Sequence, residues 1–116
     1  MHRLHSKERS DLLPGTLEMM ILLTLRRGPL HGYAIAQEIE HRSEELLRVE
    51  EGSLYPALQR MLRQKWVEAE WTVSAKNRRI RQYQLTAAGR KQIEREVSRV
   101  SRLIEGLTRM MRLAES

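Results

Sequence analysis

The longest apolar segment of the chain runs from Leu17 to Leu25, and its hydrophobic side chains surround a helix axis instead of forming one stripe. This pattern predicts a helix that begins at Thr16, whose hydroxyl group can cap it, and that ends at Gly28-Pro29, which cannot continue the spiral. A helix that is apolar on most sides must be covered on most sides. We expect the protein's own core to cover one side of it and a second subunit to cover another.

Two amphipathic helices are expected next. The first, His31 to Arg42, places four apolar side chains around one face: Tyr33, Ile35, Ala36 and Ile39. The second follows an acidic connector and opens at Glu51-Gly52-Ser53, with Ser53 as its cap and Pro56 in its first turn.

The helix that opens at Ser53 has a buried stripe of apolar residues at the spacing i, i+4, i+7 and i+8: Leu54, Leu58, Met61 and Leu62. Its opposite face carries hydrogen-bonding and cationic groups without a carboxylate: Tyr55, Pro56, Gln59, Arg60 and Arg63. This helix therefore presents a face suited to an anionic partner.

A β-hairpin is predicted after this helix. Apolar and polar residues alternate from Val67 to Val73, which indicates a strand with Trp71 on its inward, core-facing side. A return strand covers Ile80 to Leu85, and the tip between them contains Asn77, which tolerates a positive backbone φ. The tip carries cations and no anion.

The last segment is predicted to be one long helix, with Thr86 as its cap. Its apolar residues recur at spacings of four and three: Ile93, Val97, Val100, Ile104, Leu107 and Met111. This is a heptad seam, which indicates a helix partner; the alternative is a helix that lies across the core of its own domain.

Composition narrows the function classes. The chain has 116 residues, which predicts one domain, and no cysteine, which excludes disulfides and cysteine-based chemistry. Its longest apolar stretch falls far short of the roughly 20 residues that cross a bilayer, and its polar N-terminus lacks a signal-peptide core. We therefore expect a cytoplasmic protein with no membrane partner.

The formal net charge is +6, and its distribution is uneven. Acidic residues are absent from Trp71 to Ile93 and are concentrated between Gln37 and Gly52. This separation predicts one positive and one negative face, and the basic balance favours a polyanionic partner, although charge alone does not separate nucleic acid from an anionic membrane surface.

Three helices, a basic hairpin and a long helix make a mainly α chain with a small β-hairpin (α+β). This is the order of a winged helix-turn-helix followed by a C-terminal dimerisation helix. The expected parts are a flexible N-terminal arm (1–12), the DNA-binding domain (13–86) and the dimerisation helix (87–116). A helix fits the major groove of DNA, and a cationic hairpin can follow the neighbouring phosphates or enter the minor groove.

Five strings resemble the PadR family of bacterial transcriptional regulators: LLPGTLEMMILLTL, GPLHGYAIAQEI, VEEGSLYPALQRM, AEW and RQYQLTAAGRKQI. The resemblance covers roughly Leu12 to Glu96, and its most specific motifs are HGY, GSLYPAL and YxLTxxG. It implies a homodimeric repressor that binds a palindromic operator and releases it when a small lipophilic or aromatic effector binds near the dimer interface. The single C-terminal helix is similar to that of the compact subfamily, whereas Lys65-Trp66 replaces the usual small residue before the first wing strand.

Candidate site residues follow from the patterns and the resemblance together. Those expected to contact double-stranded DNA are Ser53, Tyr55, Pro56, Gln59, Arg60, Arg63, Lys76, Asn77, Arg78, Arg79 and Arg81. Those expected at the dimer interface are Leu17, Met20, Ile21, Ile93, Val97, Val100, Ile104, Leu107 and Met111. Trp66 and Trp71 are candidates for an effector pocket.

Other interpretations compete with this one. Tyr55 could pack against a neighbouring turn, the arginines could be merely solvated, and Trp71 could belong to the core. The domain could instead be a protein-interaction module, or could bind RNA. We expect no metal, cofactor or catalytic activity, because His31 and His41 lack a third ligand and no Ser/His/Asp arrangement or phosphate-binding glycine loop is present.

Overall fold

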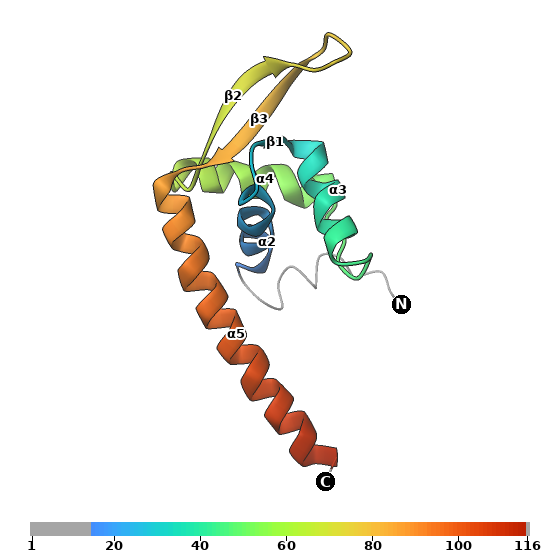
Figure 1. Ribbon diagram of the computed structural model, residues 1–116, viewed down its shortest axis with the longest axis vertical. Coiled ribbons are helices and arrows are strands. Elements are labelled where there is room, and N and C mark those ends of the chain that lie inside the picture. Colours follow the sequence, from blue (N-terminus) through green and yellow to red (C-terminus); the bar gives the residue numbers. More distant parts are fainter. Residues whose placement is uncertain (1–14, 116) are drawn as a thin grey trace.

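The structure is a computed structural model that describes residues 15–115, so the expected arm at 1–12 lies outside the described residues. Figure 1 shows a compact helical body with a hairpin at one end and a long helix extending from the other. The elements in chain order are α2 (Thr16–Leu25), β1 (Leu30–His31), α3 (Gly32–Arg42), α4 (Glu51–Arg63), β2 (Val67–Val73), β3 (Arg79–Leu85) and α5 (Ala87–Glu115). The mainly α architecture with a small β-hairpin is confirmed. Within the described part of the chain, every helix is too short or too polar to cross a bilayer.

The sheet contains one strand more than the sequence pattern indicates. Its order is β1-β3-β2 and both pairings are antiparallel. The additional strand β1 has two residues, with Leu30 opposite Tyr83 and His31 opposite Gln82. A strand this short has no measurable alternation, so hydrophobic periodicity could not reveal it. It ties the segment between α2 and α3 to the hairpin.

Helix α2 lies at the centre of the core and packs against α3, α4, α5 and β3. Ile21 and Leu22 are fully buried among apolar residues from these elements, which include Ile35, Leu58 and Met61. The other elements of the protomer therefore cover much of α2. Leu17 and Met20 stay only partly buried against the core.

Two predicted helix caps are wrong. Helix α2 is preceded by Gly15 at φ 87, and the Thr16 hydroxyl does not cap it: its oxygen is buried and has no hydrogen-bond partner among residues 15–115. Helix α4 begins at Glu51, two residues before Ser53, because the amides of Ser53 and Leu54 both donate to the Glu50 carbonyl. Pro56 consequently lies beyond the first turn, where the carbonyl it leaves unbonded belongs to the exposed Gly52.

Three apolar side chains expected on buried faces are exposed: Tyr33 (53%), Trp71 (58%) and Val73 (58%). Trp71 and Val73 do lie on the same side of β2 as Val67 and Ala69, which pack in or against the core at the base of the hairpin. The hairpin, however, projects past the helices (Figure 1), and the described helices leave its distal half exposed. On α4, Leu62 is only partly buried, and Ala57 takes its place in the core.

A rigid joint connects the hairpin to α5. The Thr86 hydroxyl accepts a hydrogen bond from the Gly89 amide (3.0 Å), as predicted for a cap, and donates one to the Lys65 carbonyl (2.6 Å). A Cβ atom on Gly89 would lie 2.1 Å from the Trp66 carbonyl oxygen, so only glycine permits this approach. Lys65 adopts φ 64 at the turn into β2.

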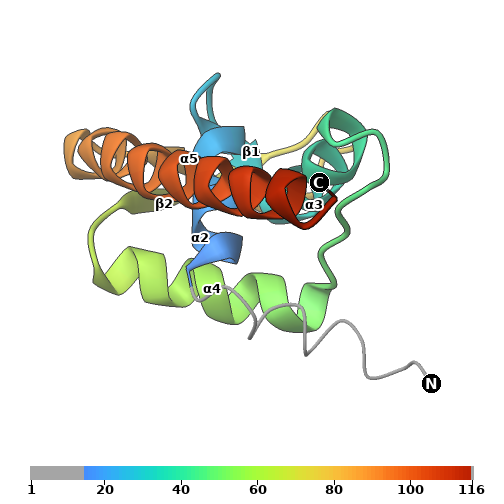
Figure 2. The same ribbon diagram turned by 90° about the horizontal axis from the view of Figure 1, so that it is seen from below.

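Helix α5 packs against α2 with its N-terminal part and then extends away from the body (Figure 1), and the view from below shows its whole length in front of the other elements (Figure 2). Of the predicted seam, Ile93 is buried and Val97 is partly buried against the core. The C-terminal part of the seam is exposed: Ile104 (56%), Leu107 (47%) and Met111 (59%). The described residues of one chain therefore leave much of the seam uncovered.

Candidate nucleic-acid interface

The outward face of α4 is centred on Gln59 and Arg63. Leu54, Leu58 and Met61 are fully buried on the opposite side, which fixes the rotation of the helix about its axis. At 100° per residue, Gln59 and Arg63 then point away from the core, and Tyr55 and Arg60 lie on the two flanks of the exposed face. Neither the Gln59 nor the Arg63 side chain has a hydrogen-bond or ion-pair partner among residues 15–115. Both are available to a ligand.

Tyr55 both packs against a turn and reaches solvent. A Cβ atom added to Gly32, the first residue of α3, would lie 2.7 Å from Cε1 and 2.8 Å from the hydroxyl oxygen of Tyr55. The ring therefore rests where only glycine leaves room, yet 41% of the residue is exposed. Burial, the charge of Glu51 and the neighbouring Tyr83 raise the Tyr55 pKa above its ordinary value, which keeps the hydroxyl a hydrogen-bond donor.

Arg60, on the opposite flank of α4, is occupied by an ion pair. Its Nη2 atom lies 2.9 Å from Oε2 of Glu18 on α2, and its Nε donates to the same oxygen at 3.0 Å. Ser53 lies on this flank too. It lines a groove of about 320 Å³ between the start of α2 and the connector before α4, together with acidic residues that include Glu45 and Glu50. The structure thus separates Ser53 and Arg60 from Tyr55.

The hairpin tip is a defined turn that carries the predicted cations. The amide of Ser74 donates to the Arg78 carbonyl (2.8 Å), and the Ser74 hydroxyl oxygen accepts from the amides of Lys76 (3.3 Å) and Arg78 (3.2 Å). Asn77 adopts φ 62, the positive angle predicted for it at the hairpin tip. Lys76 and Arg78 are exposed, and neither forms an ion pair within the described ranges. The turn therefore holds two uncompensated charges at its end.

One surface of the hairpin, here called the inner face, continues from the core to the tip. The cross-strand pairs Ala69–Tyr83, Trp71–Arg81 and Val73–Arg79 lie on it. The Arg79 guanidinium carbon lies 4.8 Å from the centre of the Trp71 ring, and that of Arg81 lies 5.9 Å from the ring centres of both Trp71 and Tyr83. Arg79 and Arg81 are thus brought together, as expected of neighbouring site residues, because both contact the Trp71 ring.

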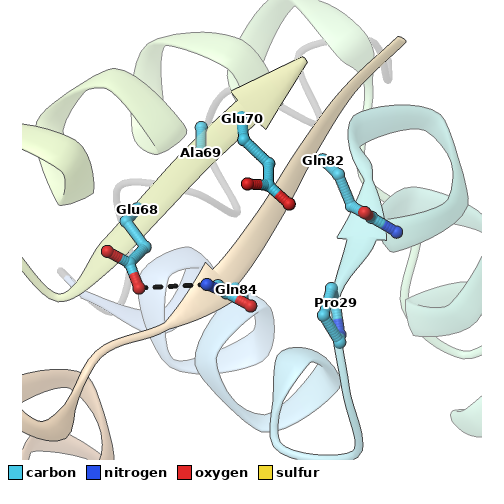
Figure 3. A pocket seen from close by; sticks show the side chains of 6 residues that line it. All are labelled: Pro29, Glu68, Ala69, Glu70, Gln82 and Gln84. Atoms are coloured by element: carbon cyan, nitrogen blue, oxygen red, sulfur yellow. Dashed lines mark hydrogen bonds between the residues drawn. The ribbon is translucent and has the colours of Figure 1, made fainter. Parts of the chain in front are cut away.

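The opposite surface of the hairpin, the outer face, is acidic near its base. Glu68 and Glu70 of β2 lie beside Gln84 and Gln82 of β3 around a hollow of about 110 Å³ (Figure 3). The Gln84 amide donates to the Glu68 carboxylate at 3.0 Å. The strand alternation over residues 68–81 already separates these acidic residues from the arginines of the inner face. The two faces of the hairpin have opposite charge.

The two tryptophans take separate positions. Trp66 is partly buried against the core beside the α5 joint, whereas Trp71 is exposed on the hairpin. Neither lines the groove at α2 or the hollow on the outer face. A shared effector pocket is therefore not formed by the described part of a single chain.

The residues predicted for the dimer interface also divide. Ile21 is fully buried and Ile93 is 5% exposed, so both belong to the core of the protomer and leave almost no surface for a second subunit. Leu17, Met20, Val97 and Val100 are partly buried. The more distal seam residues on α5 are the accessible ones.

Comparisons with known proteins agree with this architecture. A family model described as "Transcriptional regulator PadR-like family" matches residues 21–95. An uncharacterised protein X of Lysinibacillus sphaericus is 29% identical over 82 residues, which are 71% of this chain and 75% of the relative. A 37.1 kDa protein encoded in a transposon of Streptomyces fradiae is 42% identical over 86 residues, which are 74% of this chain but only 23% of that protein.

Three solved structures illustrate the likeness of fold. A transcriptional regulator from Clostridium thermocellum has a TM-score of 0.77 at 24% identity, over 86% of this chain and 97% of that one. A PadR-like transcription factor from Bacteroides fragilis has a TM-score of 0.70 at 27% identity, over 90% and 99% of the two chains. Bacillus subtilis PadR, solved in complex with operator DNA, has a TM-score of 0.64 at 22% identity, over 71% and 46%.

Proposed function

The chain belongs to the PadR-like family of transcriptional regulators, and on that premise we propose that it is a homodimeric, cytoplasmic repressor of a palindromic DNA operator. In this proposal residues 13–86 form the winged helix-turn-helix, α4 is the recognition helix, the β2–β3 hairpin is the wing, and residues 87–116 form the dimerisation helix. Membership of this family supports a role as a regulator rather than as an enzyme.

One observation carries the proposal. The outward face of α4, with Gln59 and Arg63, and the inner face of the wing, with Arg79, Arg81 and the tip cations Lys76 and Arg78, present hydrogen-bonding and cationic groups, and Glu51 beside Tyr55 lies at the edge of this surface. Glu68 and Glu70 lie on the other face of the wing. A double helix of DNA is a polyanion that offers a groove to a helix and phosphates to a hairpin beside it. The relative from Bacillus subtilis, solved with operator DNA, supports the same partner.

The two parts of this surface have different tasks. Gln59 and Arg63, at the centre of the α4 face, match the edges of adenine and guanine in the major groove. The wing cations contact phosphates, which look alike along the duplex and so provide affinity with little sequence preference. The Tyr55 hydroxyl, on the flank next to the wing, donates to a phosphate at the groove edge.

Dimerisation is supported by the exposed apolar seam of α5. Ile104, Leu107 and Met111 each leave about half of their surface in water, an arrangement that a second copy of the helix would relieve. A two-fold symmetric dimer would place its two α4 helices in successive major grooves, which matches a palindrome. A small lipophilic or aromatic effector, bound between subunits near Trp66, would release the operator.

The test is a pair of titrations with the full chain at several salt concentrations. One duplex carries the DNA upstream of the protein's own gene, and the other carries the same bases scrambled. A regulator binds the first duplex more tightly, and its affinity for both falls steeply with salt because bound cations displace counterions. Weak, salt-insensitive binding to both duplexes would favour the protein-interaction module instead.

A further inference from the structure

Trp71 is an exposed indole in an unusual place. It lies on the inner face of the wing, beyond the point where Tyr83 (3% exposed) closes the core, and 58% of its surface is accessible. It belongs neither to the hydrophobic core nor to the partly buried residues packed around it. An aromatic side chain of this size in open solvent at a proposed binding surface indicates a contact with a partner.

The surroundings of Trp71 prepare two guanidinium groups for a ligand. Arg79 and Arg81 lie over its ring with their charged carbons 4.8 and 5.9 Å from the ring centre. A guanidinium held over a ring by a cation–π contact still has N–H groups that can donate to a phosphate. The Nε atom of Arg81 is shielded from water and has no hydrogen-bond partner among the described residues. The two guanidinium groups are thus held in place by the ring while at least one N–H donor is left without a partner among the described residues.

The positive charge of the inner face of the hairpin favours a polyanionic partner. No acidic residue occurs between Trp71 and Ile93, and Lys76 and Arg78 lie at the end of the same hairpin. The carboxylates of Glu68 and Glu70 are on the outer face (Figure 3), so only the inner face can approach a polyanion without repulsion. Helix α4 packs against β2, so the hairpin lies beside the proposed recognition helix. The partner that meets α4 would therefore meet Trp71 as well.

We propose that Trp71 is a DNA-contacting residue of the wing: its indole packs on a deoxyribose of the backbone and holds Arg79 and Arg81 against the flanking phosphates. This inference rests on the proposed function and adds to it an apolar contact with the sugar. It also makes Trp71 a positioning residue for two phosphate-binding arginines. The contribution is independent of sequence, because every nucleotide offers the same sugar and phosphate.

The first experiment compares three variants on operator and scrambled duplexes. Trp71→Ala should weaken binding to both duplexes about tenfold, because the sugar contact and the order of two guanidiniums are lost. It should also make the slope of log K against log salt shallower by about one to two. Trp71→Phe, which keeps a ring, should retain most of the affinity. Thr72→Ala is the control, since Thr72 lies in the same strand on the outer face, opposite Ile80, and its loss should leave binding unchanged.

A second measurement uses the indole itself. The chain has two tryptophans, so Trp66→Phe leaves Trp71 as the sole emitter. Adding duplex DNA should change its emission and protect it from acrylamide quenching. Thermal unfolding of Trp71→Ala should match wild type, because the side chain lies outside the core.

The outcomes separate this inference from the proposed function. If the wild-type protein binds neither duplex in a salt-dependent way, both are wrong. If wild type binds while Trp71→Ala binds equally well with the same salt slope and Trp71 emission stays unchanged, the protein remains a DNA-binding regulator and Trp71 has no role in it.

Discussion

Arg60 of α4 and Glu18 of α2 form an ion pair, 2.9 Å between Nη2 and Oε2, although 42 residues separate them in the chain. The pair joins the proposed recognition helix to the helix that carries Leu17 and Met20. It also makes the two arginines of α4 unequal. Arg60 already has a carboxylate partner, whereas Arg63 has none within the described residues.

Replacing Arg63 with Ala should therefore weaken DNA binding more than replacing Arg60. Glu18→Gln should have the opposite effect and strengthen binding about two- to fourfold at low salt, because it frees the Arg60 guanidinium. Since the pair is partly exposed, its loss should lower the free energy of unfolding by less than about 1 kcal/mol. Fluorescence anisotropy with labelled duplex and urea unfolding measure both effects. Equal losses for the two arginine variants would contradict the assignment.

Gln59 should read a base. Gln59→Ala should cost about 1 to 3 kcal/mol on the operator if the amide forms a bidentate contact, and should leave a scrambled duplex nearly unaffected. Gln64, an exposed glutamine just beyond α4, is the matched control and should tolerate Ala on both duplexes. Equal losses for Gln59→Ala on operator and scrambled DNA would show that α4 contacts the phosphate backbone and does not read bases through Gln59.

Lys76 and Arg78 should supply affinity without specificity. About eight phosphate contacts per dimer would give a slope of log K against log salt of roughly −7, and removing both cations from each protomer would bring it to about half that value. The loss should be similar on all sequences. A variant with Ala at Arg95 and Arg102 of α5 loses the same charge and should keep the steep slope.

The seam of α5 should hold two chains together. Val100→Asp with Ile104→Asp places charges on the partner-facing stripe, where burial without a counterion is costly. Light scattering should report a monomer for this variant and a dimer for wild type. Ser98→Asp, on the polar side of the same helix, should leave the dimer intact. A dimer that survives the double substitution would show that the seam is misassigned.

The phenol of Tyr55 should contribute a pH dependence at the alkaline end. Its pKa is raised in the folded state, so the folded protein holds the proton more tightly than the unfolded chain. Stability is therefore complete below the ordinary value of 10.0 and falls as pH rises through the raised pKa. Urea unfolding at several pH values above 9 should show that Tyr55→Phe loses less stability than wild type across this range. On DNA, the same variant should weaken binding by about 1 kcal/mol, for one lost hydrogen bond.

Hydrophobic periodicity predicted the helices and the hairpin because each buries one face or one stripe. Burial of one face makes apolar residues recur at a regular spacing in the sequence. The cap at Thr86 and the turn at Asn77 were predictable from local chemistry alone. The caps at Thr16 and Ser53 were wrong since the backbone can begin a helix earlier than its best capping side chain. Cap preference amounts to only about 1 kcal/mol, which the packing of a core readily exceeds.

Burial at the distal hairpin could not be predicted in the same way. Alternation assigns Trp71 and Val73 to a face, but it does not say whether another element reaches far enough to cover that face. The contacts of α4 had a similar limit. The pair of Arg60 with Glu18 and the approach of Tyr55 to Gly32 join segments whose relative positions depend on the whole core.

The joint of Thr86, Gly89 and the Trp66 carbonyl fixes the orientation of α5 relative to the DNA-binding domain. With no room for a side chain at Gly89 and a hydrogen bond on either side of Thr86, the helix has little freedom to swivel against the domain. When two α5 helices pair through their C-terminal parts, the distance between the two DNA-binding domains is set by the helices and not by the DNA. In such a dimer the distance between the two α4 helices would be fixed. The spacing between the two operator half-sites would then select a DNA site as much as the bases within each half-site do.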